Sequence, residues 1–299
     1  MQRFTKKDFE RLFLDDDACL EWLKNYLYPN GIFCGACNRV TKHHRVTTRR
    51  SYSCDVCGHH VHPTANTIYH KSTTPLRDWF YAVFLMASTR CGISAKQLER
   101  ELGVTYKTAW RMFNKIRSML TDGGTALFGQ VEVDETYVGG KDINRHERKR
   151  SHIRGRGAGG KTPVVGMAQR KGRIVARVVP DVRASTLVPI VRAHILPTFA
   201  TTTVFTDELH SYDRLSESGY NHERIQHSAK VYVSGNVHTN TIEGFWSLVK
   251  RGINGAYHAV SPKYLQAYCD EYTFRYNHRD DAQAMFSTML KQVSISDAG

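Results

Sequence analysis

Three acidic residues within one short apolar stretch are the first candidates for chemistry. Residues 131–140 read VEVDETYVGG, and their β-branched and aromatic residues favour a strand that the glycine pair ends. Since side chains alternate along a strand, Glu132 and Asp134 share one face and Glu135 lies on the other. A carboxylate on a half-buried strand costs free energy unless a cation meets it, and Arg, Lys or a divalent metal could do so. From this stretch alone, an edge strand with solvated acids is the alternative.

Four cysteines form a second candidate site. They occur as two Cys-x-x-Cys pairs, Cys34 with Cys37 and Cys54 with Cys57, and this spacing fits a tetrahedral four-thiolate zinc site. Because four thiolates complete the coordination shell, we expect the zinc to be structural. Residues 47–52, between the pairs, are predicted to form a strand with a basic face. The nearby histidines are interpreted as surface or nucleic-acid contacts rather than ligands: His43, His44, His59, His60 and His62.

Composition places the chain among globular proteins with an acidic partner. It has 299 residues, 41% of them hydrophobic, and a formal net charge of +14, which points to nucleic acid. No apolar run approaches the roughly 20 residues of a membrane span. The N-terminus has no apolar signal-peptide core, so we expect a cytoplasmic, nucleoid-associated protein in which cysteines stay reduced and paired cysteines indicate metal.

Residues 93–111 carry the pattern of a helix-turn-helix. A short helix is predicted to begin after Ser94 and to stop at Gly103, and a second helix begins after Thr105. The exposed face of the second helix would meet phosphates and base edges with Tyr106, Lys107, Arg111 and Asn114.

A second basic segment, residues 141–161, is rich in Arg, Lys, His and Gly. Its low apolar content predicts a loop, and its centre carries Arg148, Lys149, Arg150 and Arg154. We expect the loop to meet phosphates and to order on binding. A solvated loop without a partner is the alternative.

The order of predicted elements after residue 123 is that of a ribonuclease H-like core. Three strands are followed by a helix, a strand, a short helix, a strand and a helix, at residues 131–138, 162–169, 173–179, 184–195, 203–208, 212–218, 223–226 and 240–251. The expected fold class is therefore α/β, with a mixed sheet flanked by helices. The expected domains are an N-terminal helical segment (1–30), a zinc ribbon (31–70), the helix-turn-helix region (71–122) and the ribonuclease H-like domain with its basic loop (123–299).

This topology is expected to gather three carboxylates. Asp134 lies in the first strand, Asp207 ends the fourth strand, and Glu243 lies in the helix after the last strand. First and fourth strands are neighbours in such a sheet, so the two Asp residues would be adjacent. Clustered acids repel one another unless cations bind, and the hard oxygen ligands suit Mg²⁺ or Mn²⁺. A pair of such ions supports in-line phosphoryl transfer.

The helix at 240–251 is expected to bury one apolar stripe, formed by Ile242, Phe245, Trp246 and Val249. At about 100° per residue, Glu243 and Lys250 fall together at the edge of this stripe. The helix therefore presents an acid and, two turns on, a base where the core meets solvent.

These motifs together resemble the bacterial insertion-sequence transposases of the DDE type (ISXO type) that carry an N-terminal zinc ribbon. The match rests on VDETYVGG at 133–140, TDE at 206–208, NTIEGFWSLVKRG at 240–252 and RYN at 275–277, and it covers about residues 34–277. The resemblance implies that Asp134, Asp207 and Glu243 hold Mg²⁺ or Mn²⁺ and that Lys250 holds a phosphate of the element end. Some relatives carry Asn or His at the third position, so Asn240 is an alternative. Glu132, Glu135 and Glu208 are competing acids, and Glu132 is the strongest rival.

The resemblance implies an enzyme that binds the ends of its element, cleaves there, and joins the 3′-hydroxyl to target DNA. Its expected partners are double-stranded DNA and further copies of the chain, at least a dimer on DNA. A DNA-binding regulator with an inactive catalytic core is the alternative from another class. Loss of one of the three acids would favour the regulator, and all three are present.

Overall fold

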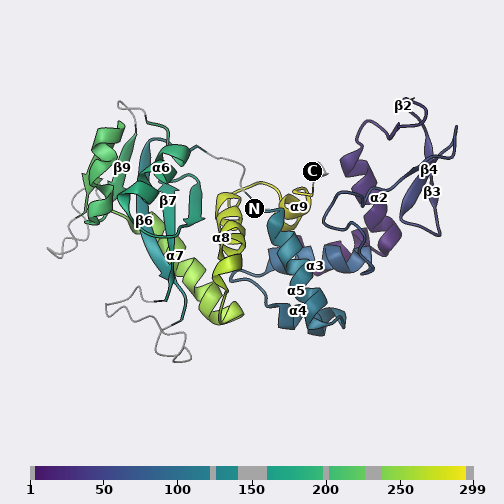
Figure 1. Cartoon of the computed structure of the whole chain (residues 1–299). Coiled ribbons are helices and arrows are strands. Elements are labelled where there is room, and N and C mark those ends of the chain that lie inside the picture. The colour runs from purple at the N-terminus through teal and green to yellow at the C-terminus, as the bar shows by residue number, and fades with distance from the viewer. Residues whose placement is uncertain (1–3, 122–125, 141–159, 198–201, 226–237, 294–299) are drawn as a thin grey trace. The chain divides into compact units, whose positions relative to one another are not determined.

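The computed structural model describes residues 4–121, 126–140, 160–197, 202–225 and 238–293 (Figure 1). The chain forms two compact units. Unit 1 comprises Met1–Met119 and Asp280–Gly299, and unit 2 comprises Leu120–Arg279. The division lies close to the predicted boundary at residue 123. The predicted ribonuclease H-like domain extends to residue 299, whereas the structure assigns Asp280–Gly299 to unit 1.

Unit 1 consists of helices and a small ribbon of short strands. The helices are α1 (Lys6–Leu12), α2 (Asp16–Leu27), α3 (Leu76–Ser88), α4 (Ala95–Leu102), α5 (Tyr106–Ser118) and α9 (Met285–Leu290). Two of the helix starts follow from local capping. The Thr5 hydroxyl accepts from the amide of Asp8, and the Asp15 carboxylate accepts from the amide of Ala18 at 2.8 Å.

The zinc ribbon has two small antiparallel sheets. One pairs β1 (Phe33–Cys34) with β2 (Arg39–Val40), and the other has the order β3 (His43–Val46), β4 (Ser51–Cys54), β5 (His60–Val61). The strand predicted at 47–52 is wrong over most of its length, because residues 47–50 form the turn that joins β3 to β4. Only the last two residues of the segment belong to a strand, β4, and composition alone could not show that the chain reverses direction there.

The helix-turn-helix pair has the predicted ends. Ser94 caps α4 by accepting from the amide of Gln97, and Gly103 ends it with φ of 65°, the left-handed conformation that glycine adopts without strain. Thr105 caps α5 in the same way through the amide of Thr108. Both helices are amphipathic, and α5 buries Ala109, Met112, Phe113 and Ile116.

Helix α9 belongs to unit 1 because its aromatic residue completes a cluster there. The ring of Phe286 stacks on Phe4 with 4.5 Å between centroids and meets Phe9, Phe13 and Phe84 at 5.9 to 6.1 Å. Phe286 is 3% exposed, so it is part of the core of this unit.

Unit 2 is a five-stranded mixed sheet with helices on both faces (Figure 1). The strand order is β10 (Asn221–Arg224), β9 (Thr203–Thr206), β6 (Gln130–Val138), β7 (Thr162–Gln169), β8 (Ile174–Val178). β6 pairs antiparallel with β7 and parallel with β9. The first and fourth strands of this unit are therefore neighbours, as predicted for a ribonuclease H-like sheet.

Two separate apolar cores cover the two faces of this sheet. On one face, Val131 and Val133 pack with Leu187 and Val191 of α6 (Ala184–His194) and with Tyr212 of the 3-10 helix η3 (His210–Ser218). On the other face, β7 and β8 pack against α7 (Asn240–Gly252) and α8 (Pro262–Asn277) through Val164, Ala168, Ile174, Ile242, Phe245, Trp246, Val249 and Leu265. The even-numbered acids of β6 thus lie on the α7 face.

One glycine allows α7 to lie this close to the sheet. Gly166 is the partner of Asp134 in the β6–β7 register, and a Cβ placed there would lie 2.4 Å from Cζ2 of Trp246 and 2.7 Å from Cδ1 of Ile242. Only hydrogen fits between the strand and the helix at this position. The closeness of α7 to Asp134 therefore depends on the absence of a side chain at residue 166.

None of the helices in the described parts of the chain has both the length and the apolar character that crossing a bilayer requires.

We predict that Gly166→Ala lowers the free energy of unfolding by about 1–3 kcal/mol, the usual result of adding volume to a packed core. Gly244→Ala is the matched control, because a Cβ there meets no atom within 4 Å and the residue lies inside α7. The control should stabilise the protein by about 0.5–1 kcal/mol. Urea unfolding followed by circular dichroism measures both, and equal effects from the two glycines would contradict the packing argument.

Candidate active site and nucleic-acid interface

Carboxylates from β6 and from the residue that follows β9 meet beside the central sheet. Oxygens of Asp134, Glu135 and Asp207 all lie within 4.8 Å of one another, and all three side chains are half-buried. The parallel pairing of β6 with β9 explains why these acids are close. Glu132 is in register with Phe205, and Asp134 and Asp207 each follow two residues later along parallel strands. The predicted adjacency of Asp134 and Asp207 is confirmed.

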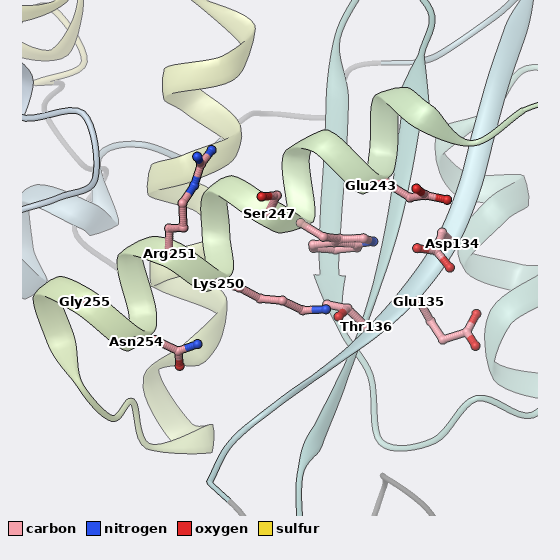
Figure 2. A pocket seen from close by; sticks show the side chains of 10 residues that line it. Asp134, Glu135, Thr136, Glu243, Ser247, Lys250, Arg251, Asn254 and Gly255 are labelled. Atoms are coloured by element: carbon pink, nitrogen blue, oxygen red, sulfur yellow. The ribbon is translucent and has the colours of Figure 1, made fainter. Parts of the chain in front are cut away.

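Glu243 lines the same pocket as Asp134 and Glu135 but lies outside the group within 4.8 Å. Figure 2 shows its side chain reaching from α7 toward Asp134 of β6. The pocket has a volume of about 710 Å³. The hydroxyl of Thr239 donates to Oε1 of Glu243 at 2.8 Å, so one carboxylate oxygen has a fixed partner. The structure thus brings the third predicted acid to the site without placing it in the cluster.

Glu135 is the site residue that sequence reasoning treated only as a competitor. Strand alternation places it on the α6 face of β6, where the Tyr212 hydroxyl donates to its Oε2 at 3.1 Å. It still reaches the cluster, because Asp207 follows the last residue of β9 and carboxylates from both faces of β6 approach it. The alternation of side chains along β6 does not predict that Glu135 reaches the cluster, because it carries no information on where the neighbouring strand β9 ends.

The electrostatics of the cluster follow from burial and like charge. Burial, followed by the charge of Asp207, raises the pKa of Asp134 from its ordinary value of 3.8 to about 7. The same two causes raise the pKa of Glu135 from 4.5 to about 7. Each carboxyl therefore ionises less readily than an ordinary one, and nearby positive charge would favour the ionised forms. Oxygens at this mutual spacing suit an ion such as Mg²⁺, which binds oxygen at about 2.0–2.1 Å.

Glu132, the strongest rival, has a different environment. Its side chain is fully buried, and its carboxylate accepts hydrogen bonds from the backbone of α7, from the Thr241 hydroxyl at 3.0 Å and from Arg170 Nε at 2.8 Å. It does not belong to the carboxylate cluster. The two remaining alternatives, Glu208 and Asn240, are both exposed and outside that cluster.

The other end of the pocket is basic and polar. Lys250, Arg251 and Asn254 line it along α7 and the π-helical turn η5 (Ile253–Tyr257). In Figure 2 the Lys250 side chain extends along the pocket toward Thr136 of β6. The predicted placement of Glu243 and Lys250 along one edge of the helix is confirmed, because both line this pocket. The pocket is therefore suited to an anion whose reacting end lies near the carboxylates and whose other end lies near Lys250.

The four predicted zinc ligands lie together in unit 1. Their sulfurs are all within 4.8 Å of one another, with 3.5 Å between Cys34 and Cys57 and 4.0 Å between Cys37 and Cys54. A tetrahedral ion with Zn–S bonds of about 2.3 Å would space its sulfurs by about 3.8 Å, so the donor set fits. The Thr41 hydroxyl lies 3.1 Å from Sγ of Cys54, where it can donate a hydrogen bond to a thiolate.

The predicted DNA contacts divide into two groups. Tyr106, Lys107 and Arg111 of α5 are exposed, Tyr106 at 50%, as a docking face requires. The basic loop contacts Arg148, Lys149, Arg150 and Arg154 lie outside the described residues.

The raised pKa of Asp134 predicts how stability depends on pH. The native state keeps a proton up to about pH 7 that the unfolded chain releases near 3.8, so its stabilising effect is lost as pH rises between these values. In Mg²⁺-free, zinc-loaded protein at pH 8, Asp134→Asn should therefore raise the free energy of unfolding by at least about 1 kcal/mol, and the melting temperature with it. The gain should be smaller at pH 5. Calorimetry at both pH values measures this.

Asp181→Asn is the matched control for that measurement. The pKa of Asp181 is lowered by hydrogen bonds from Thr186 and the Arg183 amide, so its charge state does not change between pH 5 and 8. The difference between this variant and the parent protein should stay constant over that range. An Asp134→Asn difference that is equally constant would contradict repulsion in the cluster.

Comparison with known proteins finds a matching family model in each unit. A family model described as an ISXO2-like transposase domain matches residues 126–277, and another described as a transposase zinc-ribbon domain matches residues 14–60. The chain is 30% identical over 279 residues, 89% of its length, to an "uncharacterized protein in transposable element ISH50" of Halobacterium salinarum, and the match covers 92% of that protein. It is 31% identical over 123 residues, 41% of its length, to an "uncharacterized transposase-like protein" of Haemophilus influenzae, covering 94% of that protein. With a zinc ribbon in unit 1 and the matching domain in unit 2, the chain belongs to the ISXO2-like transposases.

Proposed function

We propose that this transposase cleaves DNA at the ends of its element and transfers the 3′-hydroxyl to target DNA. The observation that carries the proposal is a single pocket with carboxylates at one end and Lys250 at the other. Phosphoryl transfer needs this pair of features, since it depends on positioning and on neutralising charge around phosphorus.

Asp134, Asp207 and Glu243 would hold the metal, and Glu135 is a fourth carboxylate within reach of two of them. When bound, Mg²⁺ or Mn²⁺ supplies activation of the attacking oxygen and stabilisation of the leaving oxygen in an in-line displacement. The chain's own groups orient these acids, Thr239 for Glu243 and Tyr212 for Glu135. The Lys250 ammonium holds a phosphate along the pocket.

Unit 1 would provide recognition of the element ends. The exposed face of α5 carries Tyr106, Lys107 and Arg111, which suit phosphate and base-edge contacts in the major groove. The zinc ribbon adds basic surface, and the net charge of +14 supports a polyanionic partner. We expect at least two copies of the chain to hold two ends together.

The direct test is strand transfer in vitro. Purified protein is mixed with Mg²⁺ or Mn²⁺, labelled duplex from the DNA that flanks the gene, and a supercoiled target plasmid. We predict that the parent protein joins label to plasmid and that Asp207→Asn lowers joining by at least about a hundredfold, because a metal ligand is lost. Lys250→Ala should lower end cleavage while leaving the fold intact.

Glu208→Gln is the control for this experiment, since it removes the neighbouring carboxylate, which lies outside the cluster. It should join label as the parent protein does. Specific binding of the duplex without cleavage or joining by any variant would favour a DNA-binding regulator.

A separate prediction concerns the zinc ribbon. Cys54→Ser should abolish zinc binding and weaken binding of the element ends by at least about tenfold, because the metal supplies much of the folding free energy of so small a ribbon. Unit 2 should stay folded. Zinc content by atomic spectroscopy and end binding by fluorescence anisotropy are the measurements. Cys91→Ser, at an exposed cysteine outside the cluster, is the control, and full end binding by zinc-free Cys54→Ser would refute the prediction.

A further inference from the structure

The first turn of α7 is capped by a side chain from a distant strand. Oε2 of Glu132 accepts the backbone N–H groups of Thr241 at 2.8 Å and Ile242 at 3.0 Å, and Oε1 accepts the Thr241 hydroxyl at 3.0 Å. The residue in the usual capping position, Thr239, makes no cap hydrogen bond and donates to Glu243 instead. The start of α7 is therefore fixed by β6 and not by its own sequence.

Arg170 completes this arrangement from the turn that follows β7. Its Nε donates to Oε1 of Glu132 at 2.8 Å, and its second terminal nitrogen donates to the carbonyl of His238 at 2.6 Å, just before α7. Its guanidinium also lies 4.1 Å from the ring centroid of Phe205 in β9. The ion pair is almost fully buried, since the Glu132 side chain is 0% exposed and the Arg170 side chain is 10% exposed.

This ion pair touches each element that carries a carboxylate of the site. Glu132 is two residues before Asp134 on the same face of β6, Phe205 is two residues before Asp207, and Thr241 is two residues before Glu243. A buried ion pair needs nearly all of its hydrogen-bonding groups satisfied, so it tolerates few arrangements of its partners. Its geometry therefore restricts where the three acids lie.

We propose that Glu132, paired with Arg170, is a positioning residue that sets α7 so that Glu243 stays beside Asp134. This inference rests on the proposed function, in which those acids hold the metal. Glu132 itself contacts no metal, because its oxygens are occupied by four donors and lie outside the carboxylate cluster.

The test is a double-mutant cycle on Mn²⁺ affinity in the full-length, zinc-loaded protein. Mn²⁺ is titrated and its free fraction is followed by electron paramagnetic resonance. Glu132→Gln keeps the shape of the side chain and removes its charge, and we expect it to weaken Mn²⁺ binding about 10-fold or more, as loss of an outer-shell partner does. Glu243→Gln should weaken binding at least as much. In the Glu243→Gln background, Glu132→Gln should change the Mn²⁺ affinity by less than about twofold, because sites acting through one group are not additive.

Glu271→Gln is the matched control. Glu271 is 0% exposed and accepts from Arg275 at 2.8 Å within α8, so it is an equally buried carboxylate of the same unit with an Arg partner. This variant should lower the melting temperature and leave Mn²⁺ affinity unchanged. If Glu132→Gln does not fold, Arg170→Lys takes its place in the same cycle, because it keeps the cation and loses the forked contact to Glu132 and His238.

Each outcome decides between the proposals. If Glu132→Gln weakens Mn²⁺ binding equally in the parent protein and in the Glu243→Gln background, the positioning role would be overturned. A direct effect of the Glu132 charge on the metal would then be indicated. Unchanged affinity in Glu132→Gln, beside weakened binding in Glu243→Gln, would overturn this inference and leave the proposed function intact. Unchanged affinity in both Glu243→Gln and Asp207→Asn would overturn the metal assignment of the proposed function, and positioning with it.

Discussion

Repulsion between carboxylates is the constraint on which unit 2 depends. Carboxylate oxygens of Asp134, Glu135 and Asp207 lie within 4.8 Å of one another, and all three side chains are half-buried, so their like charges interact strongly. Folding must hold them there against this repulsion. The sheet does so with the paired strands β6 and β9, whose backbone hydrogen bonds do not depend on the charge of the acids. The site is therefore preorganised for cations at the expense of stability in their absence.

Glu132 and Asp134 show how two carboxylates on one face of a strand acquire opposite roles. Glu132 meets backbone N–H groups of a helix start and an arginine, so its charge is matched by the protein. Asp134 meets other carboxylates and the opening of a pocket, so its charge is left unmatched. Two residues of chain separate a structural ion pair from a candidate metal site. The difference comes from the neighbours that the fold supplies and not from the residue type.

Much of this arrangement could be predicted from sequence because it follows local rules. The cysteine spacing, the caps of α4 and α5 and the apolar stripe of α7 depend on residues a few positions apart. The adjacency of Asp134 and Asp207 required only the order of the strands. By contrast, the role of Glu132 depends on Thr241 and Arg170, which are distant in sequence, and alternation correctly placed its face without indicating its partners. The presence of Glu135 in the carboxylate cluster depends on where the neighbouring strand β9 ends.

The return of the chain to unit 1 follows from the same kind of distant partnership. No local pattern marks α9 as part of the N-terminal unit, yet the ring of Phe286 packs among Phe4, Phe9 and Phe84. A fragment that ends at Met119 lacks this ring and exposes the aromatic residues that it covers. The chain crosses between the units twice, near Leu120 and near Arg279. The sequence of unit 2 is thus inserted into that of unit 1, and the core of unit 1 is complete only after unit 2 has been synthesised.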